Sequence, residues 1–380
     1  KGSLYLKDNI SIETHFSIQR LLDAGAIVHA RTTTPEFGCS GVCDSKIHGT
    51  THTPWKIGYT CGGSSGGSGA SLAVGSSLLA TGSDIGGSIR IPAACCGVVG
   101  YKPPYGRNPG CSAVHFDPYA VMGPMTRTVS DAAMMQNILC GPHPLDNASI
   151  RPKYVLPDTY NDIQGLKIAW SMDLSFFEVD EHVQVNTLKT LDALRDIGAE
   201  LVEVDFGWSA EADRSLQNYL DHLFNGYIKA IVDTNPALAT SWATYCANAA
   251  GKTSVTDFSG AYETQAKMSR QVGAIMDDCY AFICPTNNYH EIPADQDPNH
   301  PVVINGKTVN PLYGWCMAHP FNMLGRLPVL SVPSGIGGNG LPTGIQIVAR
   351  HLDDERVFRV AMALETAQPW LDCPELRPSI

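Results

Sequence analysis

Several sequence signatures that assign a function directly are missing from this chain of 380 residues. Neither a CxxC pair nor an HExxH motif occurs, so no metal site is expected. The glycine-serine run at residues 62–69 contains no lysine, which excludes a P-loop, and its glycine spacing does not fit the dinucleotide-binding pattern GxGxxG. No apolar run approaches the roughly 20 residues of a membrane-spanning helix, so no membrane partner is expected.

Positive charge is also scarce, with 26 Lys and Arg against 37 Asp and Glu and a net charge of −11. A nucleic-acid partner is therefore not expected. The 12 cysteines have no informative spacing. In a large chain they are expected to be buried free thiols in a reducing compartment, the cytoplasm. His48 and His52 are four residues apart, but the Gly-Thr-Thr between them is a poor helix, so they need not share a face.

The spacing of apolar residues predicts an α/β fold. Strands are expected at residues 3–6, 26–30, 98–102, 167–171, 200–206, 281–284, 327–332 and 344–349, and helices at 13–24, 130–140, 181–197 and 353–364. Ser130 is the expected N-cap of the second helix. Residues 210–280 are mostly helical and aromatic-rich in pattern, which indicates a cap inserted over a site. Residues 287–310 are polar and proline-rich, as in a long surface loop.

Two glycine-serine clusters, at residues 62–69 and 82–88, flank a small-residue apolar segment at 70–80 that looks helical. A flexible linker is the ordinary interpretation of GGSSGGSG. A linker does not usually continue into DIGGSIRIPAA, however, and this continuation is typical of a shaped active-site turn. Gly-x-Ser-x-Gly occurs around Ser64 and Ser65, but the strand that a nucleophile elbow requires before it is poor at residues 54–61.

Residues 60–94 resemble, almost residue for residue, the signature of the amidase signature family of serine hydrolases. Further matching pieces are the KDN at residues 7–9, TPEF at 34–37, PW at 54–55, residues 97–103, GPM at 123–125, PFN at 320–322 and LPTGIQ at 341–346. The resemblance implies one α/β domain over residues 1–380, with a mixed, twisted β-sheet surrounded by α-helices. The family's N-terminal helical region is missing, and so few residues separate Asn9 from Glu13 that an omitted segment is favoured over a lost loop.

The resemblance also assigns catalytic roles. Ser88 matches the nucleophile, Ser64 the bridging serine and Lys7 the general base. The separation of 24 residues, from 64 to 88, selects Ser64 over Ser65. A serine hydroxyl needs a base to take its proton, and a lysine can be that base if burial or a polar partner favours its neutral form. In the family, the peptide bond before the bridging serine is cis, here Gly63-Ser64.

An oxyanion hole is expected from the backbone amides of Ile85, Gly86, Gly87 and Ser88, because successive amides can surround a carbonyl oxygen. Each such donor is worth about 3 kcal/mol in the transition state. Asp84 and Arg90 are expected to hold this turn as structural partners, although Asp84 could equally be a simple turn-forming acid. Ser65 is expected to donate to the same network.

The expected substrate pocket is apolar and aromatic. The resemblance places loops from two regions near the nucleophile, and the residues expected to line the pocket there are Phe37, Gly38, Cys39, Tyr313, Trp315 and Cys316. Each of them could equally be part of the ordinary core. These side chains favour a small, hydrophobic or aryl amide, anilide or carbamate (a urethane) as the substrate. The resemblance implies a mechanism without metal or cofactor, and a monomer or homodimer.

Two other functions remain open at this point. The first is the glutaminase-like A subunit of a tRNA-dependent amidotransferase, which would need charged groups for the amino-acid end of glutamine. The segment at residues 313–317 does not offer such groups. The second is an inactive binding protein on the same scaffold, and the presence of Lys7, Ser64 and Ser88 argues against it.

Overall fold

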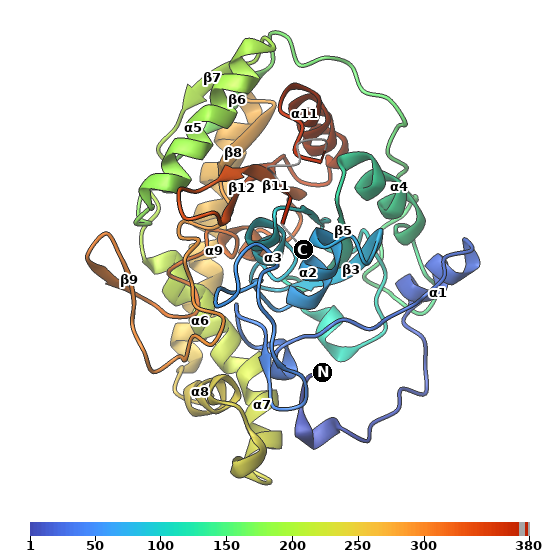
Figure 1. Ribbon diagram of the computed structural model, residues 1–380, viewed down its shortest axis with the longest axis vertical. Helices are drawn as coiled ribbons and strands as arrows, with labels where there is room; N and C mark the ends of the chain where they lie inside the picture. The colour runs from blue at the N-terminus through green and yellow to red at the C-terminus, as the bar shows by residue number, and fades with distance from the viewer. Residues whose placement is uncertain (372–376, 379–380) are drawn as a thin grey trace.

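The computed structural model describes residues 1–371, 377 and 378, and its centre is an eight-stranded sheet (Figure 1). The strands, in their order across the sheet, are β3 (Leu79–Asp84), β5 (Val121–Thr126), β4 (Val99–Lys102), β11 (Val329–Ile336), β12 (Pro342–Val348), β8 (Ala281–Pro285), β6 (Lys167–Trp170) and β7 (Glu200–Glu203). Strand β6 pairs in parallel with β7 and β8, whereas the other pairs are antiparallel. This confirms the expected α/β class with a mixed sheet.

The middle of the sheet is covered on both faces, and β8 and β12 are buried along their whole length. Successive side chains of a strand point to opposite faces. On β12, Ile345 and Ile347 belong to the core formed with α4 (Val129–Leu139), α5 (Glu181–Asp196) and α11 (Asp354–Ala367). Gly344 and Gln346 lie on the other face, against α3 (Arg90–Cys96). A Cβ at Gly344 would come within 2.9 Å of Ala94 Cβ, so this glycine allows α3 to pack closely on the sheet.

Residues 211–278 contain four α-helices, α6 (Glu211–His222), α7 (Phe224–Val232), α8 (Ser241–Ala249) and α9 (Val255–Asp278). Helix α6 packs on α9, and α7 packs on α8. In Figure 1, α6, α7 and α8 lie together below the sheet. No helix among the described residues is long and apolar enough to span a membrane. The cysteines within residues 1–371 are free thiols, and all except Cys111 are buried.

Near the N-terminus, two strand predictions were wrong. Residues 4–6 form a 3₁₀ helix, η1 (Leu4–Leu6), which begins at Ser3, and residues 26–30 form no regular element. Ile27 is 89% exposed and Val28 is 58% exposed. A β-strand requires hydrogen bonds from a neighbouring strand, and in this structure neither segment has one. The chain from Asn9 to Glu13 is also exposed.

The remaining elements match the sequence predictions more closely. Helices α4, α5 and α11 and strands β4, β6, β7, β8, β11 and β12 are confirmed to within a few residues. The expected helix at 13–24 is α1 (Phe16–Asp23), capped by His15, and α4 is capped by Thr128 instead of Ser130.

Other predicted boundaries were wrong because long-range pairing overrode the local pattern. The apolar segment at 70–80 divides between α2 (Gly66–Ala73) and β3. Strand β3 forms because β5 pairs with it along its full length, and the pattern had predicted neither strand. The polar stretch at 287–310 contains a hairpin of β9 (Val302–Ile304) and β10 (Lys307–Val309). Small elements complete the chain, namely β1 (Asp44–Ser45), β2 (Gly49–Thr50), η2 (Glu36–Gly38), η3 (Ala113–Phe116), η4 (Pro236–Leu238) and α10 (Pro320–Met323).

Candidate active site

Ser88 lies on a tight turn between β3 and α3. Strand β3 ends at Asp84, and the helix begins at Arg90. Gly87 has a φ of 115°, and a Cβ there would lie 2.7 Å from Ala318 Cβ and 2.8 Å from Ile91 Cδ1. Both its conformation and its surroundings therefore require glycine. The turn leaves Ser88 only 9% exposed.

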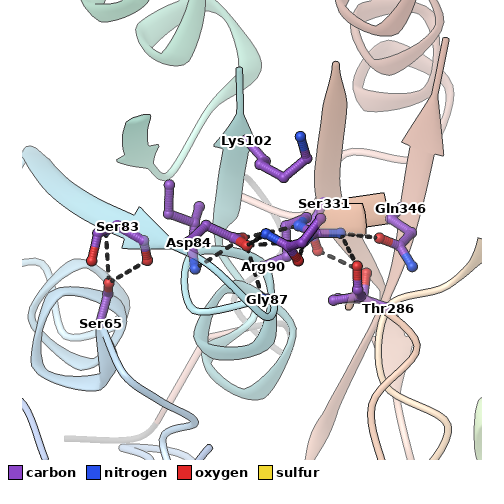
Figure 2. A network of polar contacts seen from close by, with 12 residues as sticks. Ser65, Ser83, Asp84, Gly87, Arg90, Lys102, Thr286, Ser331 and Gln346 are labelled. Carbon is purple, nitrogen blue, oxygen red and sulfur yellow. Dashed lines mark hydrogen bonds and ion pairs between the residues drawn. The ribbon is translucent and has the colours of Figure 1, made fainter. Parts of the chain in front are cut away.

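Asp84 holds this turn from inside. Its carboxylate accepts hydrogen bonds from the backbone N–H groups of Gly87, at 2.8 Å, and Ile89, at 3.2 Å. The Arg90 guanidinium donates two more, both at 3.0 Å (Figure 2). Burial alone would raise the pKa of Asp84, but the charge and hydrogen bonds of Arg90 outweigh burial and hold the pKa at about 2. An ionised carboxylate thus fixes the backbone on both sides of Ser88.

This arrangement removes the N–H of Gly87 from the donors of the predicted oxyanion hole. Ile85, Gly86 and Ser88 line a cavity, whereas Gly87 does not. The N–H of Gly87 points to Asp84 Oδ1 and is already engaged there. The positive φ of Gly87 turns its peptide group toward the carboxylate, a direction that sequence pattern alone does not reveal.

Two buried amide side chains complete the network around Arg90, and sequence analysis had not assigned them to the site. Asn322 Oδ1 accepts from Arg90 Nη2 at 2.7 Å, and its Nδ2 donates to Asp84 Oδ1 at 2.8 Å. Gln346 Oε1 accepts from Arg90 Nη1 at 2.9 Å. Both amide side chains are fully buried. In the sequence, each stands between two apolar residues, Asn322 in FNM and Gln346 in IQI. A lone amide within an apolar run is the signal that could have identified them, because a buried amide needs polar partners.

Lys102 lies beside this network in Figure 2, at the end of β4. Its ammonium group is buried and donates to the backbone carbonyls of Leu327, at 2.9 Å, and Gly325, at 3.4 Å. Burial and the nearby charge of Arg90 lower the pKa of Lys102 to about 7, although Asp84 and Asp354 oppose the shift. Through these hydrogen bonds, Lys102 connects residues 325–327, which follow Asn322, to strand β4 of the sheet.

The segment that contains Ser64 is joined to the turn at Ser88. The peptide bond Gly63–Ser64 is cis, and Ser64 is 7% exposed. The N–H of Ser65 donates to the carbonyl of Ser88 at 3.2 Å. The hydroxyl of Ser65 accepts from Ser83 N at 3.2 Å and donates to Ser83 O at 3.4 Å, which anchors this segment to β3 (Figure 2). The structure therefore brings the two serine segments together.

A small cavity of about 40 Å³ opens at Ser88. Its lining residues are Gly38, Cys39, Ser40, Gly41, Gly63, Ile85, Gly86, Ser88, Ile91, Leu220, Phe224, Asn225, Cys246, Leu312 and Tyr313. Of the predicted pocket residues, Phe37, Trp315 and Cys316 do not line it. Trp315 is 1% exposed, lies against Gly41 and donates its indole N–H to Pro311 O at 3.0 Å. Trp315 and Cys316 therefore belong to the core behind the pocket wall.

Helices far along the chain close this cavity. Leu220 comes from α6, Phe224 and Asn225 from α7, and Cys246 from α8. A volume of about 40 Å³ corresponds to roughly three water molecules.

Lys7 lies apart from the two serines in this structure. It follows η1, its side chain is exposed, and it is not among the residues that line the cavity. No hydrogen bond joins Lys7 to Ser64 or Ser88 within the described residues. The burial that was expected to favour a neutral Lys7 is therefore absent here.

The segment that carries Lys7 is nevertheless tied to the neighbourhood of Ser64. Ser3 Oγ donates to Glu36 Oε1 at 2.6 Å, and the N–H of Phe37 donates to Lys1 O at 2.9 Å. Gly38, which follows directly, lies against Ser64, because a Cβ at this glycine would be 3.4 Å from Ser64 Oγ. The first residues of the chain are thus bonded to Glu36 and Phe37, which directly precede the glycine that lies against Ser64.

Comparisons with known proteins identify the family of this chain. The family model described as Amidase matches residues 1–358. The chain belongs to the amidase family. An acylamidase of Rhodococcus erythropolis is 34% identical over 377 residues, covering 98% of this chain and 78% of the relative. The crystal structure of a bacterial aryl acylamidase of the amidase signature family superposes with a TM-score of 0.89 at 28% identity, covering 96% of this chain and 78% of the other.

This amidase also resembles a protein of the alternative class. The A subunit of the glutamyl-tRNA(Gln) amidotransferase of Geobacillus stearothermophilus is 34% identical over 376 residues, covering 92% of this chain and 76% of the relative. The comparisons therefore confirm the expected family, the fold and an amide-hydrolysing enzyme. Sequence identity alone does not show whether the chain is more similar to the acylamidase or to the amidotransferase subunit.

The network around Arg90 leads to a testable prediction about the amidase. Replacing Asn322 with alanine should lower kcat by about 10- to 100-fold and leave KM nearly unchanged, because Asp84 loses a donor that orients it and the turn at Ser88 shifts. The free energy of unfolding should fall by about 1–3 kcal/mol, since the buried partners of Asn322 are left unsatisfied. Steady-state kinetics and denaturant unfolding would measure the two effects.

A matched control separates positioning from stability. Asn137 on α4 is also an amide that bonds the backbone, to Leu156 O at 2.9 Å, but it is not part of the Arg90 network. Replacing Asn137 with alanine should lower stability and preserve kcat. Equal losses of kcat in the two variants at equal stability would contradict a positioning role for Asn322.

Proposed function

We propose that this amidase hydrolyses small amides, anilides or carbamates with an apolar or aryl acyl group, through an acyl-enzyme on Ser88. The observation that carries the proposal is the lining of the cavity at Ser88, in which no described residue bears a charge. Ile85, Ile91, Leu220 and Phe224 present hydrocarbon surface, and Tyr313 adds a ring. An apolar acyl group gains from leaving water for such a site, whereas a charged group would lose its hydration there without a partner.

In the proposed first step, Ser88 Oγ attacks the carbonyl carbon, and the carbonyl oxygen becomes an oxyanion. Backbone amides from Ile85, Gly86 and Ser88 would stabilise this charge, each by about 3 kcal/mol. Asp84 supports the geometry, because its bonds to Gly87 and Ile89 hold the turn rigid before the substrate arrives. A rigid turn needs no reorganisation as the charge develops.

In the proposed proton path, Ser88 gives its proton to Ser64, and Ser64 gives its own to Lys7. Lys7 then returns one proton to Ser64, and Ser64 passes one proton to the leaving nitrogen, which must be protonated because an amine anion leaves badly. Water then attacks the acyl-enzyme, and the acid is released. The exposed Lys7 has a long, flexible stem on a segment that is bonded to residues near Ser64, so the path requires its neutral amine, formed by loss of a proton, to turn inward to Ser64.

Glutamine hydrolysis for an amidotransferase is the second candidate, because amidotransferase relatives are as similar as the acylamidase relative. The amino-acid end of glutamine carries a carboxylate and an ammonium group. Neither finds an oppositely charged side chain among the described residues of the Ser88 cavity. The apolar lining therefore favours an acylamidase over a glutaminase.

An activity panel on the purified chain would decide between these functions. We expect turnover of 4-nitroacetanilide, of a phenyl carbamate and of the ester 4-nitrophenyl acetate, and no release of ammonia from L-glutamine. Release of ammonia from glutamine at a rate above anilide turnover would overturn the proposed substrate class. A folded protein that turns over none of these compounds would indicate a binding protein on the amidase scaffold.

A further inference from the structure

A second and larger cavity lies between helix α9 and the loop at residues 324–327. Its volume is about 490 Å³, and it shares no lining residue with the cavity at Ser88. Its inner wall is apolar and consists of buried side chains, Tyr119, Val272, Met276, Leu324 and Leu327. Its size is within the range of small-molecule sites, roughly 300–1,000 Å³.

The rim of this cavity is basic. Arg326, Arg350 and His351 line it and are exposed. Arg350 is paired with Asp353 at 2.9 Å, whereas Arg326 has no ion pair within residues 1–371. The rim therefore attracts anions against the overall charge of the protein.

One acid, Asp117, lies near this rim and forms no ion pair with Arg326 within the described residues. Asp117 precedes the lining residue Pro118, and its carboxylate accepts hydrogen bonds from Tyr119 N and Tyr219 Oη, both at 2.9 Å. Both of these bonds go to Oδ1, and Asp117 is half-buried. The N–H groups of the Arg326 guanidinium can donate hydrogen bonds to a planar carboxylate.

A glycine in α9 keeps the cavity open. Gly273 lines it in the middle of a 24-residue helix, where alanine is the more favourable residue. A Cβ at Gly273 would meet no atom within 4 Å, so packing does not require glycine, and its φ is not in the left-handed region. The space above this glycine belongs to the cavity.

We propose that this cavity binds an amphipathic monoanion, namely an apolar chain or ring that ends in a carboxylate. The apolar part lies against Val272, Met276 and Leu324, and the carboxylate is held by Arg326 at the rim. This site is separate from the catalytic cavity, and the proposal does not depend on the substrate proposed above.

Calorimetric titration with dodecanoate, below its micelle-forming concentration, tests this site. We expect saturable binding to the wild-type chain and at least tenfold weaker binding to Gly273→Phe, because the ring fills the apolar wall. Gly260→Phe is the matched control. It lies on the same helix, its Cβ would also meet nothing within 4 Å, and it does not line the cavity. Its dodecanoate affinity should equal that of the wild type.

Two further measurements test the charge. Arg326→Gln should weaken dodecanoate binding about two- to fivefold, the range for one exposed ion pair. Dodecyltrimethylammonium has the same chain and the opposite charge, and it should bind at least tenfold more weakly than dodecanoate. The proposal is overturned if the wild type does not bind dodecanoate, if Gly273→Phe binds it as tightly as Gly260→Phe, or if the cation binds as tightly as the anion.

Discussion

Replacing Ser88 with alanine should lower kcat for an anilide by at least about 10³-fold and leave the protein folded. The substitution removes one oxygen from a side chain that is 9% exposed and lines the cavity at Ser88. It leaves the hydrogen bonds of Asp84 to Gly87 and Ile89 in place, since these use the backbone. Steady-state kinetics would measure the loss, and near-ultraviolet circular dichroism would establish that the fold is intact.

A buried serine outside the cavity supplies the control. Ser77 is 6% exposed and does not line the cavity, so Ser77→Ala should retain nearly full activity. A sulfonyl fluoride should label Ser88 of the wild-type chain, as read by mass spectrometry of its peptides. Near-normal anilide turnover by Ser88→Ala, or labelling at a different residue, would refute the assignment of the nucleophile.

The second large effect concerns Lys7. Lys7→Ala should lower anilide turnover by about 10²- to 10⁴-fold, the usual contribution of a positioned general base. Lys7→Arg should fail as well, because a guanidinium stays protonated. Hydrolysis of the matched ester should suffer less in both variants, since a phenolate leaves with little help from a proton. In the wild type, anilide turnover should rise with pH as one group loses a proton, and this rise should disappear in Lys7→Ala.

The exposed position of Lys7 makes this experiment decisive for the proton path. Lys189, which is exposed on α5, is the control, and Lys189→Ala should leave rates and pH profile unchanged. If Lys7 is only a surface cation, Lys7→Arg will keep most of the activity, and the alkaline rise will persist in Lys7→Ala. That outcome would assign the base to another group.

Much of the candidate site could be predicted from a single stretch of sequence. Ser64, Ser88 and the glycines around them lie within residues 62–88, and their residue types and spacing are specific enough to indicate the family. The structure places both serine segments side by side, through the bond from Ser65 N to Ser88 O. Local sequence was sufficient here because a turn is defined by consecutive residues, above all by glycines that alone tolerate its backbone angles.

Residues distant in sequence could not be found in the same way. Asn322 and Gln346 bond the guanidinium of Arg90 from positions more than 200 residues away, and Leu220 and Phe224 close the cavity from helices α6 and α7. Apolar periodicity predicted helices in residues 210–280 but not which side chains would face Ser88. Such contacts depend on how complete elements pack, and no local pattern records that packing.

The sequence by itself determined the family, the α/β class and the serine-bearing turn, because these follow from residue identity and short-range spacing. The tertiary structure decided which segments became strands. Residues 79–84 pair with β5 and form β3, whereas residues 26–30, with Ile27 and Val28, remain exposed without a partner. The physical reason is common to these cases, since the hydrogen-bond partner that stabilises each backbone group lies elsewhere in the chain.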